Sequence, residues 1–166
     1  MSLALKSPPA ELPSLVPHYS QVETPRHENG KKLFDYWGAV VAREGSFRIG
    51  RDIPARPIAA LLRNISINEP MGDGKDMRVR LAGSGMRRRF GREVAGSRLS
   101  KLFPSPAFEY HRDIGLGVLS SGKPHIVDCS LKRERIEELH SEILLLPIVD
   151  RDGESPLLLV GSFYFG

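Results

Sequence analysis

The chain has 166 residues, of which 40% are hydrophobic and 27% charged, and its formal net charge is +4 at pH 7. These values are typical of one soluble globular domain with its own core. The single cysteine, Cys129, excludes an internal disulfide and favours a reducing cytoplasm. The apolar stretches are much shorter than the roughly 20 residues of a membrane helix, and the N-terminus has no signal-peptide pattern, so we expect neither insertion nor export.

Residues 1–29 predict a flexible tail, because they contain five prolines, few bulky apolar residues and no periodicity. The single folded domain is expected over residues 30–166. It begins with a helix whose apolar stripe includes Leu33 and Trp37 and which ends at Gly45. A second helix is expected within residues 51–64, with Asp52 as its N-cap.

Residues 64–70 and 77–82 predict an antiparallel hairpin, because β-branched and alternating apolar residues flank a turn that contains Asp-Gly. Ser84 is expected to cap a short helix that directs Phe90 inward and several arginines outward. A longer helix follows over about 106–122 and ends at Gly122. Three strands complete the chain, at 125–131, 139–149 and 156–165.

The last two strands are apolar on both faces in their centres, so both faces of the sheet need a cover. The helix that carries Trp37 is the nearest candidate for the outer face, and a second copy of the chain is the next. We therefore treat Tyr36 and Trp37 as a candidate interaction surface.

The chain resembles the PAS-like family of short stand-alone bacterial regulators. The resemblance spans residues 36–150 and rests on Tyr36-Trp37 and on the stretches RDIPARPIAALLRNISI, RVRLAGSGMRRRFGREVAGSRLSKLF, SSGKPH and LLLPIVD. It implies an α+β fold in which a five-stranded antiparallel sheet carries short helices and one longer helix on one face, with the N-terminal helix beside the sheet. It also implies a sensory or interaction module without a universal cofactor.

The basic residues gather in one segment, since residues 75–101 contain nine basic and two acidic residues. Arg87, Arg88 and Arg92 are the candidate anion-binding residues, and Arg78, Arg80 and Arg89 extend the patch. A nucleic-acid or phosphate ligand is therefore the alternative function. A solvated arginine surface is the competing interpretation, and the scarcity of aromatic residues for base stacking argues against nucleic acid as the partner.

Two phosphate-binding patterns are incomplete. Gly83-Ser-Gly85 lacks the third glycine and the parallel βαβ unit of a dinucleotide site. The arginines with Asp128-Cys-Ser130 are similar to the cyclic-dinucleotide pattern of PilZ domains, but Arg133 stands where that pattern has glycine, and the order of strands differs.

A ligand pocket is expected between the sheet and the short helices. Helical phase and strand alternation predict that it is lined by Phe90, Leu102, Phe108, His111 and Cys129. Since PAS-like haem sensors carry an axial histidine on the long helix, His111 is a candidate haem ligand, and a buried, hydrogen-bonded histidine is the competing interpretation. Cys129 lacks the Asn-Cys-Arg context of a flavin photosensor.

No metal-ligand spacing and no catalytic motif occurs in the sequence, so we expect a regulatory protein and not an enzyme. The chain ends on its last strand, so signalling is expected to pass through a protein partner or a homodimer. The expected function is small-ligand sensing, protein–protein interaction or both, in bacterial signalling, and the identity of a ligand or cofactor stays open.

Overall fold

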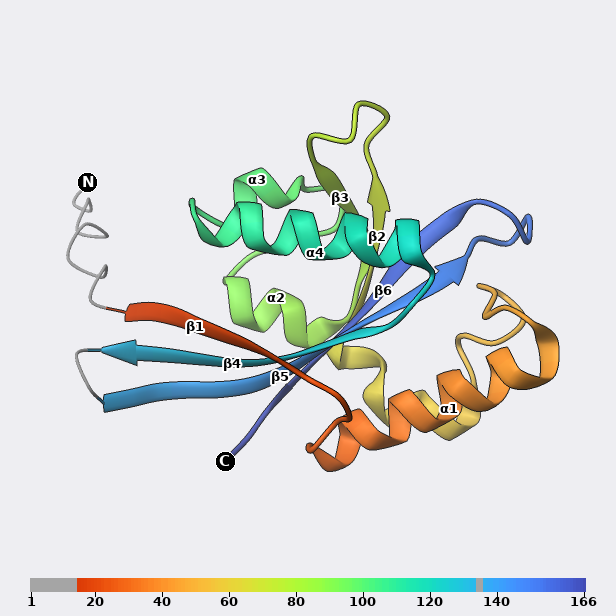
Figure 1. Ribbon diagram of the computed structural model, residues 1–166, viewed down its shortest axis with the longest axis horizontal. Coiled ribbons are helices and arrows are strands. Elements are labelled where there is room, and N and C mark those ends of the chain that lie inside the picture. Colours follow the sequence, from red (N-terminus) through yellow and green to blue (C-terminus); the bar gives the residue numbers. More distant parts are fainter. Residues whose placement is uncertain (1–14, 134–135) are drawn as a thin grey trace.

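The computed structural model describes residues 15–133 and 136–166. It shows one antiparallel sheet between two helical layers (Figure 1). The elements in chain order are β1 Leu15–Val22, α1 Glu28–Glu44, the 3-10 helix η2 Arg56–Asn64, β2 Ile65–Pro70, β3 Met77–Ala82, α2 Ser84–Phe90, α3 Leu99–Leu102, α4 Ala107–Ser121, β4 His125–Arg133, β5 Ile136–Val149 and β6 Pro156–Tyr164.

The sheet has six strands in the order β1-β4-β5-β6-β2-β3, and neighbouring strands are antiparallel. The predicted α+β, PAS-like fold is confirmed, with six strands in place of five. The additional strand is β1, which pairs along β4 from Leu15 opposite Arg133 to Val22 opposite Ile126.

The predicted flexible tail is wrong for residues 15–29, because they include β1 and the first residues of α1. Residues 1–14 of that tail lie outside the described residues. The strand was missed because its pairing partner, β4, lies more than a hundred residues away in sequence. Within residues 15–22, Pro17 and the polar residues weaken the local strand pattern.

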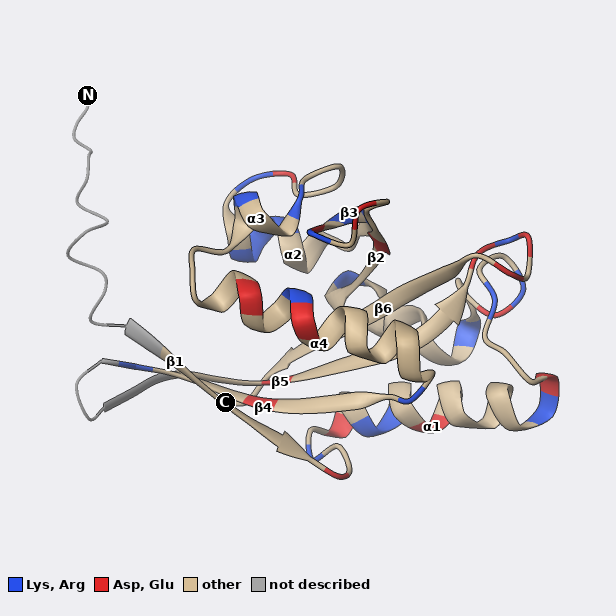
Figure 2. Cartoon of the chain, turned by 45° about the horizontal axis from the view of Figure 1, so that its top comes forward, with Lys and Arg blue, Asp and Glu red and all other residues tan. Residues whose placement is uncertain are grey.

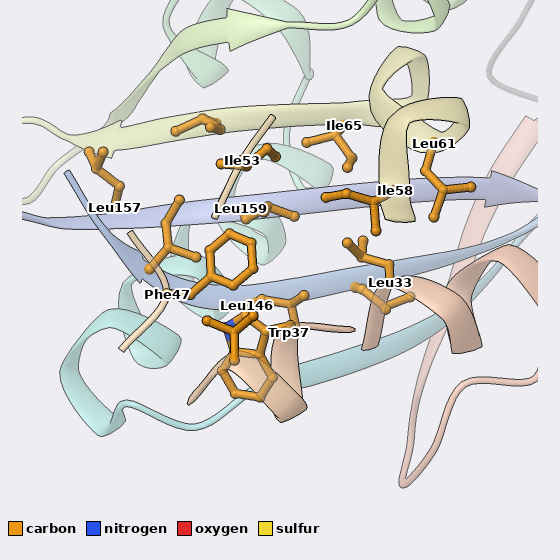
Figure 3. Packing of buried hydrophobic residues seen from close by; sticks show 14 of the residues in the cluster. Leu33, Trp37, Phe47, Ile53, Ile58, Leu61, Ile65, Leu146, Leu157 and Leu159 are labelled. Carbon is orange, nitrogen blue, oxygen red and sulfur yellow. The ribbon is translucent and has the colours of Figure 1, made fainter. Parts of the chain in front are cut away.

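Helix α1 and η2 cover one face of the sheet, as the apolar centres of the last strands require. Leu33 of α1 packs with Leu146 and Leu159 of the sheet in a continuous apolar core (Figure 3). Val40 of α1 belongs to the same core. Gly45 ends α1 with φ of 85°, a left-handed conformation that glycine adopts without strain. The outer face is therefore covered by the chain itself.

The prediction that Trp37 belongs to an interaction surface is wrong in this structure. Its side chain is 8% exposed, and its indole Nε1 donates a hydrogen bond to the carbonyl oxygen of Pro147 at 3.0 Å. Tyr36 is half-buried, and its hydroxyl donates to the carbonyl oxygen of Asp52 at 2.7 Å. Both aromatic residues attach α1 to its own domain.

Helices α2, α3 and α4 cover the other face of the sheet (Figure 1). Val118 of α4 packs in a second apolar cluster with Met77, Val127 and Leu158 of the sheet. Gly122 ends α4 in the left-handed conformation, as predicted. In the described part of the chain, no helix is long and apolar enough to cross a membrane.

Three local expectations are wrong. Asp52 is not an N-cap, because its carboxylate accepts from the Arg48 amide at 2.7 Å and pairs with Arg51. Ser84 begins α2 and makes no side-chain cap, since Gly83 occupies the cap position. The alternation within residues 77–82 predicts that Leu81 faces the core with Met77 and Val79, but Leu81 is 52% exposed, because a bulge between β2 and β3 interrupts the alternation.

Candidate ligand cavity

A cavity of about 60 Å³ lies between the sheet and the helices α2, α3 and α4. Strands β5, β6, β2 and β3 form its floor. Its apolar lining comes from both layers and includes Val79, Met86, Val94, Leu99, Leu102, Ile143, Leu145, Leu158 and Val160. Since a water molecule takes up about 10–15 Å³ of such a cavity, the cavity has room for several waters or for one compact molecule.

Three polar side chains interrupt the apolar floor. Ser66 and Asn68 alternate with isoleucines along β2, and Ser162 lies on the adjacent strand β6. Their exposed fractions are 7%, 6% and 4%. Side chains alternate between the two faces of a strand, so Ser66 and Asn68 on β2 both point toward the cavity. They do so although helices cover both faces of the sheet.

The Asn68 side chain has an unused hydrogen-bond acceptor. Within residues 15–133 and 136–166, no protein group bonds its Oδ1 atom. An unpartnered buried polar atom costs about 1–3 kcal/mol of stability. A core that served packing alone would favour an apolar residue at this position.

Replacing Asn68 with leucine is expected to stabilise the free protein, because the variant removes the unpaired amide oxygen and adds apolar contacts. We expect a rise of about 1 kcal/mol in the free energy of unfolding, or roughly 2–4 °C in melting temperature. Urea and thermal unfolding measure both quantities. A clear loss of stability would show that the Asn68 amide stabilises the folded protein.

Aromatic rings form the wall opposite the floor. Phe103 stacks on the imidazole of His111 with a centroid distance of 4.3 Å, and Phe90 meets Phe103 edge to face at 5.7 Å. Offset-stacked and edge-to-face contacts of this kind hold rings in fixed relative orientations. The wall therefore joins α2, α4 and the segment after α3.

His111 connects this wall to β1. Its Nε2 lies 3.3 Å from the hydroxyl of Tyr19, whose ring stacks on Tyr110 with a centroid distance of 3.8 Å. Burial and the charge of Arg89 lower the pKa of His111 to about 4, and burial is the main cause that raises the pKa of Tyr19 to about 12. Both groups are neutral at pH 7, so we assign the Tyr19 hydroxyl as donor and Nε2 as acceptor.

The half-buried, neutral His111 makes the free energy of unfolding depend on pH. Its folded-state pKa lies below the ordinary value of 6.5, so protons bind preferentially to the unfolded chain as the pH falls from about 6.5 to about 4. We expect His111 to contribute a loss of up to about 1.4 kcal/mol per pH unit in this window and none above it.

Urea unfolding at several pH values, on the native chain and on His111→Phe, measures this contribution. The variant is expected to lose stability less steeply with falling pH. A smaller dependence remains, because burial also lowers the pKa of His125. Equal slopes for the two proteins would contradict the assignment of a neutral His111.

Arg89 lies at the rim of the cavity. Its guanidinium carbon is 5.2 Å from the centroid of the Phe90 ring and 5.7 Å from that of Tyr164, which favours cation–π contact. Among the described residues that line the cavity, Arg89 carries the charge at neutral pH and no aspartate or glutamate offsets it. The rim is therefore electropositive.

The structure brings three of the five predicted pocket residues together, namely Phe90, Leu102 and His111. Phe108 lies instead in an outer groove beside the β2–β3 turn, in the first turn of α4. Cys129 faces the correct side of the sheet, but the sheet order places it on β4, outside the floor formed by β5, β6, β2 and β3. For these two residues the predicted lining is wrong.

Sequence reasoning missed Ser66, Asn68, Ser162 and Phe103, and it assigned Arg89 only to the outer basic surface. The polar residues of β2 alternate with isoleucine, a pattern that also describes a strand with one solvated face. They become informative only when both faces of the sheet are known to be covered.

The cavity does not fit haem. Sites for larger ligands are typically about 300–1,000 Å³, several times the volume present here. The Nε2 of His111, which would be the iron ligand, is directed to Tyr19. No group of three or more potential metal ligands occurs among the described histidine, cysteine, aspartate and glutamate side chains.

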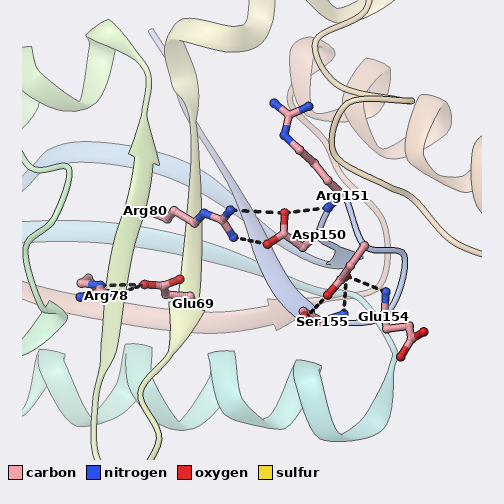
Figure 4. Close-up of polar contacts among 8 residues, drawn as sticks. Glu69, Arg78, Arg80, Asp150, Arg151, Glu154 and Ser155 are labelled. Atoms are coloured by element: carbon pink, nitrogen blue, oxygen red, sulfur yellow. Dashed lines mark hydrogen bonds and ion pairs between the residues drawn. The ribbon is translucent and has the colours of Figure 1, made fainter.

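The predicted anion-binding residues divide into two groups. Arg78 pairs with Glu69, and Arg80 pairs with Asp150 at 2.5 Å, so carboxylates offset both charges (Figure 4). Arg87, Arg88 and Arg92 are exposed, and no carboxylate of the described residues forms an ion pair with them. Figure 2 shows basic residues gathered around α2 and α3.

Comparison with protein-family models agrees with the architecture. The model of the PAS domain matches residues 25–163, from the segment before α1 to the end region of β6. The match begins after β1, so the sixth strand lies outside it. A comparison with curated proteins finds no significant match. The match covers most of the chain and, together with the antiparallel sheet and its helices, shows that the chain belongs to the PAS domain family.

Proposed function

We propose that this PAS domain is a non-catalytic sensory module that binds a small molecule in the cavity beneath α2, α3 and α4. PAS domains are in general sensory or regulatory modules. The observation that supports a ligand here is the unpartnered Oδ1 of Asn68, which is buried and lines the cavity. A bound molecule that donates a hydrogen bond would remove the cost of that unpaired atom.

Binding of a molecule in the cavity would affect the position of β1 through a short chain of contacts. A molecule in the cavity touches Phe103 and His111, which stack on each other, and His111 is hydrogen-bonded to Tyr19. Tyr19 is part of β1, which is an edge strand with one neighbour in the described sheet. Small displacements of the aromatic wall would therefore change the fraction of molecules in which β1 is paired with β4.

The edge of β1 is also the proposed contact for a protein partner or a second copy of the chain in bacterial signalling. Helices cover both faces of the sheet. The outer edge of β3 is bridged by the segment before α3, since the Val79 amide donates to Ser97 and the Gly96 amide donates to Val79. Within the described residues, β1 thus offers the unpaired strand edge that an added strand would use.

The direct test is an NMR titration of the ¹⁵N-labelled full chain with a panel of small-molecule fragments. We expect some fragments to shift amide signals around the cavity and along β1. Ser162→Leu, which fills the cavity, should abolish these shifts, and Tyr19→Phe should retain the cavity shifts while weakening those of β1. Fragment binding that Ser162→Leu leaves unchanged would place the site elsewhere.

The exposed arginines of α2 and the following turn support a second candidate, the binding of a polyanion. Arg87, Arg88 and Arg92 carry charges that described carboxylates do not offset. Contacts to phosphates weaken steeply with salt because counterions are released. Oligonucleotide binding that falls with salt and disappears when the three arginines become glutamine would favour this candidate, whereas no binding at low salt would remove it.

A further inference from the structure

We infer that the cavity selects a short-chain hydroxycarboxylate, with its carboxylate on Arg89 at the rim and its hydroxyl on Asn68 at the floor. This inference rests on the proposed function, because it assigns a chemical class to the molecule that occupies the same cavity. It depends on the charge of the rim, the hydrogen-bonding groups of the floor and the volume between them.

The rim favours an anion. Arg89 lines the cavity, and in the described part of the chain neither an ion pair nor an acidic lining residue offsets its charge. Its guanidinium lies near the rings of Phe90 and Tyr164, which restrict its orientation. A planar guanidinium binds a carboxylate through two parallel hydrogen bonds. Because Arg89 is exposed, the bound carboxylate stays partly hydrated and avoids most of the cost of burying a charge.

The floor favours a hydroxyl group. The unpartnered Oδ1 of Asn68 accepts hydrogen bonds, so the ligand must present a donor to it. A second carboxylate would instead place an acceptor against an acceptor. A hydroxyl both donates and accepts, and the hydroxyls of Ser66 and Ser162 line the same floor. The deep group is therefore a neutral hydroxyl.

The middle of the cavity favours a short apolar chain. Leu158, Val160 and Met86 line it between the two polar ends. At 10–15 Å³ for each water-sized sphere, a cavity of about 60 Å³ holds roughly four to six such spheres. With the carboxylate at the rim, this volume suits a chain of three to five carbons and excludes flavins and nucleotides.

The test is isothermal titration calorimetry on the full chain with four probes: 3-hydroxybutyrate, butyrate, 1,3-butanediol and succinate. We expect 3-hydroxybutyrate to bind at least tenfold more tightly than the other three, because each of them lacks one of the two polar groups or carries a second charge. Arg89→Gln should reduce its affinity to that of the diol. Asn68→Leu should remove the advantage of 3-hydroxybutyrate over butyrate.

Arg56→Gln is the matched control, because Arg56 is an exposed arginine at the start of η2 that does not line the cavity. It should leave the affinity unchanged. Arg89→Gln alters an exposed side chain, so it tests the inference even if the leucine of Asn68→Leu fills part of the cavity. Equal binding of acid and diol, or an unchanged affinity in Arg89→Gln, would overturn the inference.

The failure of this inference is distinguishable from the failure of the proposed function. If none of the four probes binds while other fragments shift the amide signals around the cavity, the assignment to a hydroxycarboxylate is wrong. The proposal that the cavity binds a small molecule is then retained. If neither the probes nor any fragment shifts those amides, the proposed function is wrong as well.

Discussion

Replacing Glu142 with alanine is expected to lower the free energy of unfolding by about 4 kcal/mol, because it removes two hydrogen bonds to a buried carboxylate and leaves their donors unpaired. Glu142 lies on β5 and is 1% exposed. Its carboxylate accepts from the backbone amides of Arg26 and His27, at 2.6 and 3.1 Å, immediately before α1. A single side chain of the sheet thus fixes the position at which α1 begins.

Urea unfolding of Glu142→Ala measures this effect, and the melting temperature should fall by roughly 10 °C. Glu142→Gln keeps one acceptor oxygen and should lose less stability. Glu69→Ala is the control for removing a carboxylate, since its ion pair with Arg78 is partly exposed and worth at most about 1 kcal/mol. A loss in Glu142→Ala no greater than that of Glu69→Ala would contradict the anchoring role.

Replacing Trp37 with alanine is expected to cost about 3–5 kcal/mol, as for other large aromatic residues removed from a core. The indole packs in the apolar cluster between α1 and the sheet (Figure 3). Its Nε1 donates a hydrogen bond to the carbonyl oxygen of Pro147. Trp37→Phe keeps an aromatic ring and loses only the hydrogen bond and part of the volume, so it should cost about 1–2 kcal/mol.

Chemical unfolding of both Trp37 variants, together with their oligomeric state, separates two interpretations. If Trp37 is a core residue, Trp37→Ala loses much of its stability and shows no separate effect on self-association. A Trp37→Ala variant that retained native stability and lost association would restore the interaction-surface interpretation that the sequence suggested.

The elements with strong local signals could be predicted from the sequence. The apolar stripe of α1, its glycine end, the long helix α4 and the three apolar strands all lie close to the predicted positions. Strand β1 could not be predicted, because its residues carry little strand signal and depend on pairing with distant β4. The exposure of Leu81 could not be predicted from the sequence either, because a bulge changes the side of the sheet that Leu81 faces.

The site was predicted only in part, for a related reason. Helical phase on α4 and the short helices identified His111, Phe90 and Leu102. The floor depends on which strands are neighbours, and that order excludes Cys129 and brings Asn68 under α2. The significance of Asn68 therefore emerges only from the folded arrangement.

A high-resolution crystal structure of the free protein tests the central claim most directly, because the claim depends on an unused acceptor in an accessible cavity. We predict ordered non-protein density, either water or a retained small molecule, about 3 Å from the Oδ1 of Asn68. The contradicting result is a cavity closed by neighbouring side chains, with Oδ1 accepting a hydrogen bond from a protein group.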